Sequence, residues 1–550
     1  MEIKKPIAHG IFFAAALPDW LGWQACRSHP KRTQEKRLRR ILRQNADTEF
    51  GKRHGFAAIH TVQEYQQRVP LADYESFSLQ VARMRAGERN VLCREQPRLF
   101  QPTSGSTGAG KWIPYTPSLK REFLRGVNPW LSDLYLHRPR LFGGKAYWQI
   151  SPAVDSPARS GSNVSGFTDD AEYLGPIAQL VWNEISAVPA AARHIADPNT
   201  FRYLSALCLL RAHDLRLISV WSPSFLSLLL ETIVTHRADL LEDLRSGGIS
   251  TERYLPEQLR SSKSFAFRPL PKRAIELKKL LEAPHICWTR VWPQLALISC
   301  WKDGFAKRLT PALERDFEGV EIQGKGVLAT EGIVSFPLTA HPHGAVPAIN
   351  SHFLEFCESA SPQLRLVDEL ELGMRYSVVL TTGGGLYRYR LQDIVEVVGF
   401  ADRLPLLRFI GRESSVSDLF GEKLHESQIE EAVKAALEML PSLPQFTLFT
   451  CEKIADRYSY CLLLQTEVLC ESTKAQLLET IETRLLDNIH YRYCRSLGQL
   501  GPLKLFYVRE HGLATYVAAL QKRGIREGDL KPGLLANGPG WLAQFTIDEQ

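Results

Sequence analysis

The stretch Thr103-Ser104-Gly105-Ser106-Thr107-Gly108-Ala109-Gly110-Lys111 decides how this sequence is interpreted. Its glycines let backbone N–H groups approach phosphate oxygens, its hydroxyls add hydrogen bonds, and its lysine adds positive charge. A Ser/Gly-rich linker would have a similar composition, but the apolar run at 112–115 that follows must be packed. The pattern therefore predicts a polyphosphate cradle. The residues expected to bind the phosphates are Thr103, Ser104, Gly105, Ser106, Thr107 and Lys111.

Part of this stretch also fits a different phosphate-binding motif. Residues 105–111 match G-x-x-x-x-G-K, the start of a Walker P-loop, which needs Ser or Thr next to hold Mg²⁺. The next residue here is Trp112. A P-loop also follows a buried strand and opens a helix, whereas residues 98–102 are a poor strand candidate and Pro114 disfavours a helix. The sequence therefore disfavours a P-loop kinase or NTPase.

Two further polar motifs follow the Gly-rich stretch. Ala329-Thr330-Glu331-Gly332 contains a carboxylate, the ligand type that a hard cation such as Mg²⁺ prefers. Residues 387–393, Tyr-Arg-Tyr-Arg-Leu-Gln-Asp, end in a second carboxylate at Asp393. Taken alone, the first motif is typical of a surface turn and the second of a charged strand end. The order of the motifs along the chain is stronger evidence than either motif by itself.

In this order, with Gly411-Arg412 further on, the motifs resemble those of the adenylate-forming superfamily, which includes acyl-CoA synthetases and firefly luciferase. The resemblance implies that Thr330 contacts the α-phosphate of ATP and that Glu331 helps to hold Mg²⁺. It also implies that Asp393 binds both ribose hydroxyls and that Arg412 lies near the ribose. Two positions depart from the pattern: Gln392 replaces the usual glycine, and Ser414 replaces the usual hinge acid. These departures leave the local turn and the pivot open.

Other segments narrow the resemblance to one family. Residues 409–412 and 421–424, with Thr48-Glu49-Phe50-Gly51, Trp292-Pro293 and Leu217 to Leu230 ahead of the Gly247-Gly248 turn, resemble the auxin-responsive acyl acid amido synthetases of plants and their bacterial relatives. The resemblance covers nearly the whole chain. It implies an ANL-type α/β fold, with a large N-terminal domain of parallel sheets and a small β-barrel, and a small α+β C-terminal domain.

The same resemblance implies a catalytic residue and a reaction. Lys531, in Gly528-Asp529-Leu530-Lys531-Pro532, matches the lysine that enters the site during adenylation, where it would neutralise charge as pyrophosphate leaves. The protein is expected to be an AMP-forming carbon–nitrogen ligase that uses ATP and Mg²⁺. It would activate a small carboxylic acid as an acyl-adenylate and pass the acyl group to an amine, an amino acid according to the resemblance.

Hydrophobic patterning predicts the same general architecture. Residues 215–221 are typical of a buried strand, and the helix expected at 225–234 follows Ser222-Pro223-Ser224, which supplies capping chemistry. A strand followed by a helix in this way suggests a largely parallel sheet. Strands at 376–382, 386–390 and 394–398, with a turn at 383–385, suggest an antiparallel sheet or small barrel.

The last part of the chain has the patterning of a small α+β domain. A capping box is expected at Ser427 to Glu430, at the start of a helix with apolar residues from Ile429 to Leu440. Strands are expected at 446–449 and 458–464, and a second helix with Leu477 to Ile489 on one face. We therefore divide the chain into residues 1–411, an adenylation domain for ATP and the acyl acid, and residues 412–550, a mobile C-terminal domain.

Bulk properties restrict the possible partners and compartment. The chain has 550 residues, a net charge of +7 and no long basic stripe interleaved with aromatics, so nucleic acid is not expected as a partner. Residues 27–43 suggest an amphipathic surface helix. The apolar run at 11–17 is too short to cross a bilayer and lacks a cleavage pattern, and ten scattered cysteines suggest buried reduced thiols. A cytoplasmic protein is expected, and the resemblance suggests a monomer.

Alternative functions remain at this point. An acyl-CoA or acyl-carrier-protein ligase shares the adenylation step, and a non-catalytic nucleotide-binding relative would explain the departures at Gln392 and Ser414. A metal hydrolase built on His341-Pro342-His343 lacks a nearby third ligand. The acyl site remains undefined, with Trp221 and Phe336 as candidate lining residues.

Overall fold

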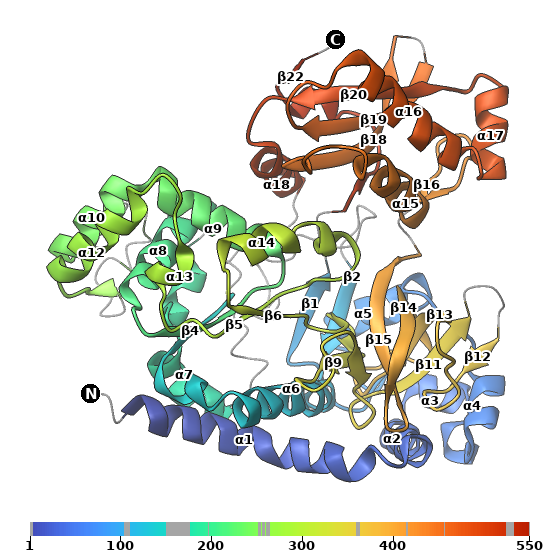
Figure 1. Ribbon diagram of the computed structural model, residues 1–550. Helices are drawn as coiled ribbons and strands as arrows, with labels where there is room; N and C mark the ends of the chain where they lie inside the picture. Colours follow the sequence, from blue (N-terminus) through green and yellow to red (C-terminus); the bar gives the residue numbers. More distant parts are fainter. Residues whose placement is uncertain are drawn as a thin grey trace. The chain divides into compact units, whose positions relative to one another are not determined.

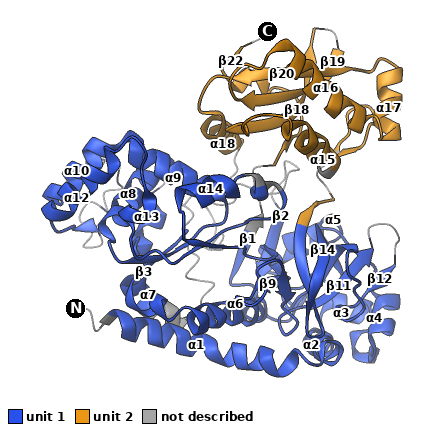
Figure 2. Cartoon of the chain, viewed as in Figure 1, with its two compact units in different colours: residues 1–409, 526–529 blue, residues 410–525, 530–550 orange. Residues whose placement is uncertain are grey.

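A computed structural model describes residues 4–103, 111–149, 176–195, 197–250, 255, 259, 265–358, 363–413, 416–455, 457–523 and 533–548. Within these residues the chain forms two compact units, coloured separately in Figure 2. The first unit runs to Phe409 and the second begins at Ile410. Each unit is described by itself below.

The first unit begins with helices that pack against strands from much later in the sequence. In α2, Leu38, Ile41 and Leu42 are buried while the basic residues lie mostly outward, which confirms the amphipathic surface helix. The Gln34 side chain of α2 bonds the backbone of Ile349, His352 and Leu354. The helices of this segment are α1 (Lys4–Cys26), α2 (Pro30–Gln44), α3 (Glu49–Arg53), α4 (Val62–Arg68) and α5 (Glu75–Arg85).

A four-stranded parallel sheet confirms the α/β prediction. Its order is β3-β4-β5-β6, and every neighbouring pair is parallel. The strands are β3 (Lys145–Trp148), β4 (Leu215–Ser219), β5 (Leu297–Ser299) and β6 (Glu321–Gln323). The expected helix after β4 is α9 (Pro223–Thr235), where the Ser222 side chain accepts a hydrogen bond from the N–H of Ser224. The other helices of this region (Figure 1) are α6 (Pro117–His137), α7 (Pro176–Ile185), α8 (Pro198–Arg211), α10 (Arg237–Ser246), α12 (Pro271–Leu281), α13 (Trp288–Val291) and α14 (Thr310–Asp316).

A seven-stranded antiparallel sheet holds the later motifs of the first unit. Its order is β12-β11-β13-β14-β15-β10-β9. The strands are β9 (Ser335–Pro337), β10 (Ala345–Pro347), β11 (Phe353–Glu358), β12 (Leu364–Arg365), β13 (Arg375–Thr381), β14 (Tyr389–Ala401) and β15 (Leu404–Arg412). The prediction of separate strands at 386–390 and 394–398 is wrong. Residues 386–388 are not in a strand, and residues 389–390 and 394–398 belong to the single strand β14, which continues through an irregularity at residues 391–393.

Two small hairpins complete the first unit. Strands β1 (Leu99–Thr103) and β2 (Lys111–Tyr115) pair antiparallel, as do β7 (Leu328–Ala329) and β8 (Gly332–Ile333). The sequence predicts that residues 98–102 do not form a good strand, and this prediction is wrong for Leu99 onward. Pairing with β2 and burial of Phe100 outweigh the weak local preference.

The second unit is an α+β fold around a five-stranded sheet of order β21-β18-β19-β20-β22. The strands of this sheet are β18 (Phe446–Ile454), β19 (Arg457–Gln465), β20 (Leu500–Val508), β21 (Leu535–Ala536) and β22 (Ile547–Asp548). A separate pair is formed by β16 (Val416–Ser417) and β17 (Leu424–His425). Its helices are α15 (Glu426–Leu437), α16 (Glu471–Leu485), α17 (Ile489–Ser496) and α18 (Gly512–Lys522). The strands expected at 446–449 and 458–464 are confirmed within β18 and β19.

Two helix boundaries in the second unit differ from expectation. Helix α15 begins at Glu426 with His425 as its N-cap, so the capping box expected at Ser427 is wrong; Gln428 instead accepts from the His425 N–H. The helix expected to continue to Ile489 ends at Leu485, because Asn488 caps the separate helix α17.

The remaining bulk predictions also have structural counterparts. All ten cysteines lie in described residues and are free. Six are buried as expected, whereas Cys26 and Cys357 are partly buried and Cys287 and Cys470 are exposed. None of the helices among the described residues is long and apolar enough to cross a bilayer. His341 and His343 lie in the connection between β9 and β10, and no metal-binding group of three or more His, Cys, Asp or Glu occurs in the described part of the chain.

Candidate active site

The Gly-rich stretch connects the two strands of a hairpin. The last backbone pair joins Thr103 to Lys111, and residues 104–110 between them lie outside the described residues. The Lys111 ammonium lies 5.9 Å from the ring centroid of Tyr74, whose hydroxyl accepts a hydrogen bond from the Trp112 N–H at 2.7 Å. A strand rather than a helix follows Lys111, which confirms that this is not a Walker P-loop.

The second motif forms the tight turn between β7 and β8. Ala329 pairs with Gly332, so Thr330 and Glu331 occupy the turn. Glu331 is only 5% exposed, and its Oε1 accepts a hydrogen bond from the Tyr389 hydroxyl at 3.2 Å. A surface turn would leave this carboxylate in water. Its burial at a turn fits a binding role better than a solvated one.

Most residues of the third motif are buried, so this motif is not simply a charged strand end. The Tyr387 hydroxyl donates to the Leu92 carbonyl at 2.7 Å, and its ring stacks on Phe50, in the Thr48–Gly51 segment, at 4.7 Å. Burial raises the pKa of Tyr387 well above its ordinary value, so the hydroxyl remains a donor. Arg388 is buried as well, and Arg390 is the only exposed residue among residues 387–390.

Asp393 lies in a bulge of β14. On β13, Ser377 pairs with Ile394 and Val379 pairs with Arg390, so three residues of β14 lie opposite one residue of β13. The extra residues include Gln392, whose φ of 66° is left-handed, and Asp393, which is buried. Bulges re-aim side chains and are common beside functional sites. The position that departs from the family pattern therefore has the backbone conformation that glycine adopts most easily.

Replacing Gln392 with Gly is expected to stabilise the protein by up to about 1 kcal/mol, because glycine has no Cβ to strain a left-handed backbone. Thermal or urea unfolding of the two proteins measures this change. Gln392→Ala is the matched control: it also removes the side chain but keeps the Cβ, so it should bring no gain. Equal effects of Gly and Ala would show that the backbone at 392 carries no strain.

The segments that contain the motifs are linked through a single stretch of the N-terminal region. Ala72 forms a parallel bridge with Tyr389, and two residues later Tyr74 bonds the backbone of Trp112. Tyr389 in turn bonds Glu331. The structure thus joins β2, the β7–β8 turn and β14 in one network within the first unit. This linkage connects residues more than 300 positions apart in the sequence.

The described residues do not include every predicted site residue. Ser104, Gly105, Ser106, Thr107, Ser414 and Lys531 lie outside the described residues, as does the side chain of Thr103. Arg412 ends β15 and belongs to the second unit, so its relation to the motifs of the first unit remains a prediction. Thr330 and Lys111 are partly buried and lie in the turn and strand described above.

The two candidates for the acyl site differ. Phe336 is buried core and packs against Trp23 at 5.3 Å. Trp221 is partly exposed just beyond the carboxyl end of β4, beside Trp301 and 5.0 Å from the Lys325 ammonium. Lys325 also donates to Ser219 Oγ at 2.7 Å and lies 5.1 Å from the Trp130 ring. No sequence motif had indicated Lys325 or Trp130, because their proximity depends on the order of the parallel strands.

The residues present are compatible with a magnesium ion. Mg²⁺ in nucleotide sites is usually held by one or two carboxylates together with substrate phosphates and water, rather than by a full protein cage. Glu331 offers one buried carboxylate, with one oxygen oriented by Tyr389. This donor set fits a metal that arrives with a polyphosphate.

Comparison with protein families gives matches along nearly the whole chain. The chain matches the GH3 family N-terminal domain over residues 23–322, the GH3 family central domain over 345–412 and the GH3 family C-terminal domain over 427–539. Indole-3-acetic acid-amido synthetase GH3.6 of Arabidopsis thaliana is 24% identical over 459 residues, covering 76% of this chain and 73% of the relative. GH3.8 of Oryza sativa subsp. indica, with the same activity in its name, is 25% identical over 523 residues, covering 86% and 83%.

Solved structures show the same fold. The AtGH3.15 acyl acid amido synthetase in complex with 2,4-DB superposes with a TM-score of 0.82 at 20% identity, covering 95% of this chain and 94% of that one. A 2-hydroxyisobutyryl-CoA ligase in its postadenylation state is more distant, with a TM-score of 0.51 at 12% identity and coverage of 92% and 89%.

Proposed function

Since this chain belongs to the GH3 family, we propose that it is an ATP-dependent acyl acid amido synthetase. In the first step an oxygen of the acid's carboxylate attacks the α-phosphorus of ATP, and pyrophosphate leaves. The product is an acyl-adenylate. In the second step the amine of an amino acid attacks the acyl carbon, AMP leaves, and the amine loses a proton to give the amide.

The observation that carries this proposal is the hydrogen bond between Tyr389 and Glu331. It joins the β7–β8 turn to the strand that contains Asp393, at a distance of 3.2 Å and with both side chains buried. In the proposed mechanism Thr330 binds the α-phosphate, and Asp393 accepts hydrogen bonds from the ribose hydroxyls. The stretch 103–111 cradles the phosphates, with Lys111 supplying positive charge.

Further groups act in the same step. Mg²⁺, held by Glu331 and the phosphates, would reduce the charge that builds up on the oxygens around the α-phosphorus. The resemblance of their sequence positions supports Arg412 at the ribose and Lys531 as the lysine that offsets charge on the departing pyrophosphate. It also supports residues 412–550 as a domain that moves between the two steps.

The acyl acid is proposed to bind at the carboxyl end of the parallel sheet, where ligands of open α/β sheets commonly lie. Trp130 and Trp221 flank the Lys325 ammonium there. A cation between aromatic rings suits an aromatic acid, whose ring packs against indole while its carboxylate meets the ammonium. The substrates in the names of its relatives, indole-3-acetic acid and 2,4-DB, support including aromatic acids among the first to be tested.

Replacing Lys325 with Met is expected to raise the KM for the acid by about 10-fold or more, because a charge-assisted hydrogen bond is lost, while the KM for ATP changes little. Initial rates at varied acid and ATP concentrations separate the two constants. Lys272→Met removes an exposed lysine of α12 and should leave both unchanged. An unchanged KM for the acid in the Lys325 variant would remove Lys325 from the acid site.

The decisive experiment is ATP–pyrophosphate exchange with a panel of aromatic, fatty and other small carboxylic acids, with Mg²⁺ and no amine. Exchange with one class of acid would establish adenylation and identify the donor. Amino acids and coenzyme A are then added separately, and mass spectrometry identifies an amide or a thioester. A thioester alone would assign the chain as an acyl-CoA ligase, and failure to bind ATP would make it a non-catalytic relative.

The setting of the reaction is also part of the proposal. We place the enzyme in the cytoplasm as a monomer that needs neither nucleic acid nor a membrane. The ten free cysteines support a reducing compartment, since secreted proteins of this cysteine content usually form disulfides.

A further inference from the structure

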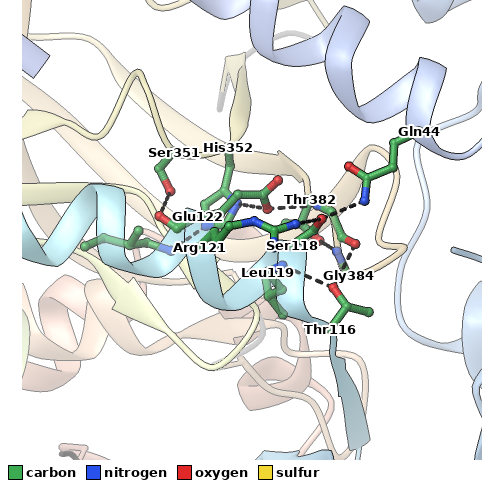
Figure 3. Close-up of polar contacts among 12 residues, drawn as sticks. Gln44, Thr116, Ser118, Leu119, Arg121, Glu122, Ser351, His352, Thr382 and Gly384 are labelled. Carbon is green, nitrogen blue, oxygen red and sulfur yellow. Dashed lines mark hydrogen bonds and ion pairs between the residues drawn. The ribbon is translucent and has the colours of Figure 1, made fainter. Parts of the chain in front are cut away.

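A buried carboxylate–imidazole pair lies among the nucleotide motifs of the first unit and has no part in the mechanism above. Glu122 of α6 is 6% exposed, and His352, just before β11, is fully buried. The His352 Nδ1 lies 3.0 Å from Glu122 Oε2. Figure 3 shows the two side chains facing each other, with a dashed line for this contact. The two residues are 230 positions apart in the sequence. Taking two such polar groups out of water is costly, so their burial needs an explanation.

The hydrogen bonds fix the protonation of the histidine ring. The backbone N–H of Ile333 can only donate, and it points to His352 Nε2 at 3.1 Å, so Nε2 must be an unprotonated acceptor. The ring proton is therefore on Nδ1 and is donated to Glu122. The same Glu122 oxygen accepts a second hydrogen bond from the Gly383 N–H at 2.8 Å. One carboxylate oxygen and one imidazole thus hold two backbone segments.

These two segments adjoin the second and third motifs. Ile333 is two residues after Glu331, in the strand that closes its turn. Gly383 begins the turn between β13 and the Tyr387–Asp393 stretch. Glu122 itself lies in α6, the helix that follows the β1–β2 hairpin connected by the Gly-rich stretch. The Thr116 side chain, at the start of that helix, donates to the Gly383 carbonyl at 3.0 Å.

The glycines of the motifs allow this close approach. A Cβ on Gly332 would lie 2.9 Å from His352 Nε2, and a Cβ on Gly383 would lie 2.7 Å from Glu122 Oε1. Real Cβ atoms are essentially never found within 3.0 Å of another group. The pair and the two glycines therefore fit each other. The Ser351 hydroxyl also donates to the Glu122 carbonyl, which fixes the chain before His352 against α6.

From this arrangement we propose that Glu122 and His352 are positioning residues for adenylation. They hold the Glu331 turn and the segment leading to Asp393 in register with α6, the helix that follows the β1–β2 hairpin. Neither side chain touches the substrates. The pair acts through backbone groups, and the inference rests on the function proposed above for Glu331 and Asp393.

Two substitutions of His352 separate its two hydrogen bonds. His352→Gln can place an amide oxygen near the position of Nε2 and still accept from Ile333. His352→Asn can retain a donor to Glu122, but it has no acceptor that reaches Ile333. If the pair positions the Glu331 turn, the Asn variant should lose about 3–10-fold in kcat for pyrophosphate exchange, the value of the one hydrogen bond to Ile333 that it removes. The Gln variant should retain most of the activity.

The KM for ATP should change less than kcat in the Asn variant, and the Mg²⁺ concentration for half-maximal exchange should rise. A purely structural role would instead destabilise both variants and leave the kcat of the folded protein unchanged. The matched control is His137→Asn, at the C-terminal end of α6, the helix that contains Glu122. This variant should behave like the wild type. If the Asn variant does not fold, Glu122→Asp provides the same test, because its shorter carboxylate cannot reach both Gly383 and His352.

The outcomes separate the two proposals. No exchange by the wild-type protein with any acid would overturn the proposed function. Exchange by the wild-type protein with equal kcat in the folded Asn or Asp variant would overturn the positioning role alone.

Discussion

Replacing Glu331 with Gln is expected to lower the rate of ATP–pyrophosphate exchange by about 10²–10³-fold, the usual effect of removing one preorganised group that stabilises transition-state charge. Glutamine has nearly the same shape, and its amide oxygen can still accept from the Tyr389 hydroxyl, so the turn between β7 and β8 should be retained. What is lost is the negative charge that Mg²⁺ requires. Exchange assays over a range of Mg²⁺ concentrations measure the effect.

Tyr389→Phe is the graded control for this prediction. It keeps the Glu331 carboxylate and removes only the hydroxyl that orients it, so the loss should be about 3–10-fold, the value of one ordinary hydrogen bond. Unchanged exchange in the Gln variant at limiting Mg²⁺ would contradict the assignment of Glu331 as a metal ligand. It would leave the burial of this carboxylate to be explained by the Tyr389 bond alone.

Replacing Arg388 with Met should have the largest effect on stability, a loss of about 3–5 kcal/mol, because it leaves a buried charge without its partner. Arg388 donates to Glu355 at 3.2 Å and to the backbone carbonyls of Gln66 and Val69. Burial raises the pKa of Glu355, and the Arg388 charge is the main factor that opposes this rise. Urea unfolding followed by tryptophan fluorescence measures the loss.

Two controls accompany the Arg388 variant. Arg245→Met makes the same substitution in an exposed pair with Glu242 and should leave stability unchanged. The double variant Arg388→Met with Glu355→Gln should recover part of the loss, because no unpaired charge is then buried. Equal stability of the single and double variants would show that the lost backbone contacts, rather than the buried carboxylate, account for the effect.

The sequence alone indicated the parallel part of the fold and the nature of the motifs. Ser222 before an apolar run correctly predicted a capped helix, although α9 begins at Pro223 rather than Phe225, because capping and hydrophobic patterning are local signals. Trp112 and Pro114 correctly excluded a P-loop for the same reason. The strand at Leu99–Thr103 was missed because its stability comes from pairing with β2, which no local preference reveals.

The parts of the site that depend on long-range contacts could not be predicted. Gln392 signalled a departure from the family pattern, but the sequence gives no sign that its backbone would remain left-handed in a bulge. The burial of Arg388 depends on Glu355, which is 33 residues away, and on the carbonyls of α4 and Val69. The Glu122–His352 pair spans 230 residues, and neither residue lies in a recognisable motif.

The contacts of the N-terminal helices with late strands also govern how the protein is made. Tyr65 bonds Thr381, Ala72 pairs with Tyr389, and Gln34 bonds the backbone around His352. On the ribosome these partners emerge roughly 300 residues after the helices, which at 5–20 residues per second is a delay of about 15–60 s. During that time the apolar faces of the first helices have no native partner. Nascent chains of this protein should therefore bind chaperones at their N-terminal end, and truncation before residue 390 should yield aggregation rather than a folded half.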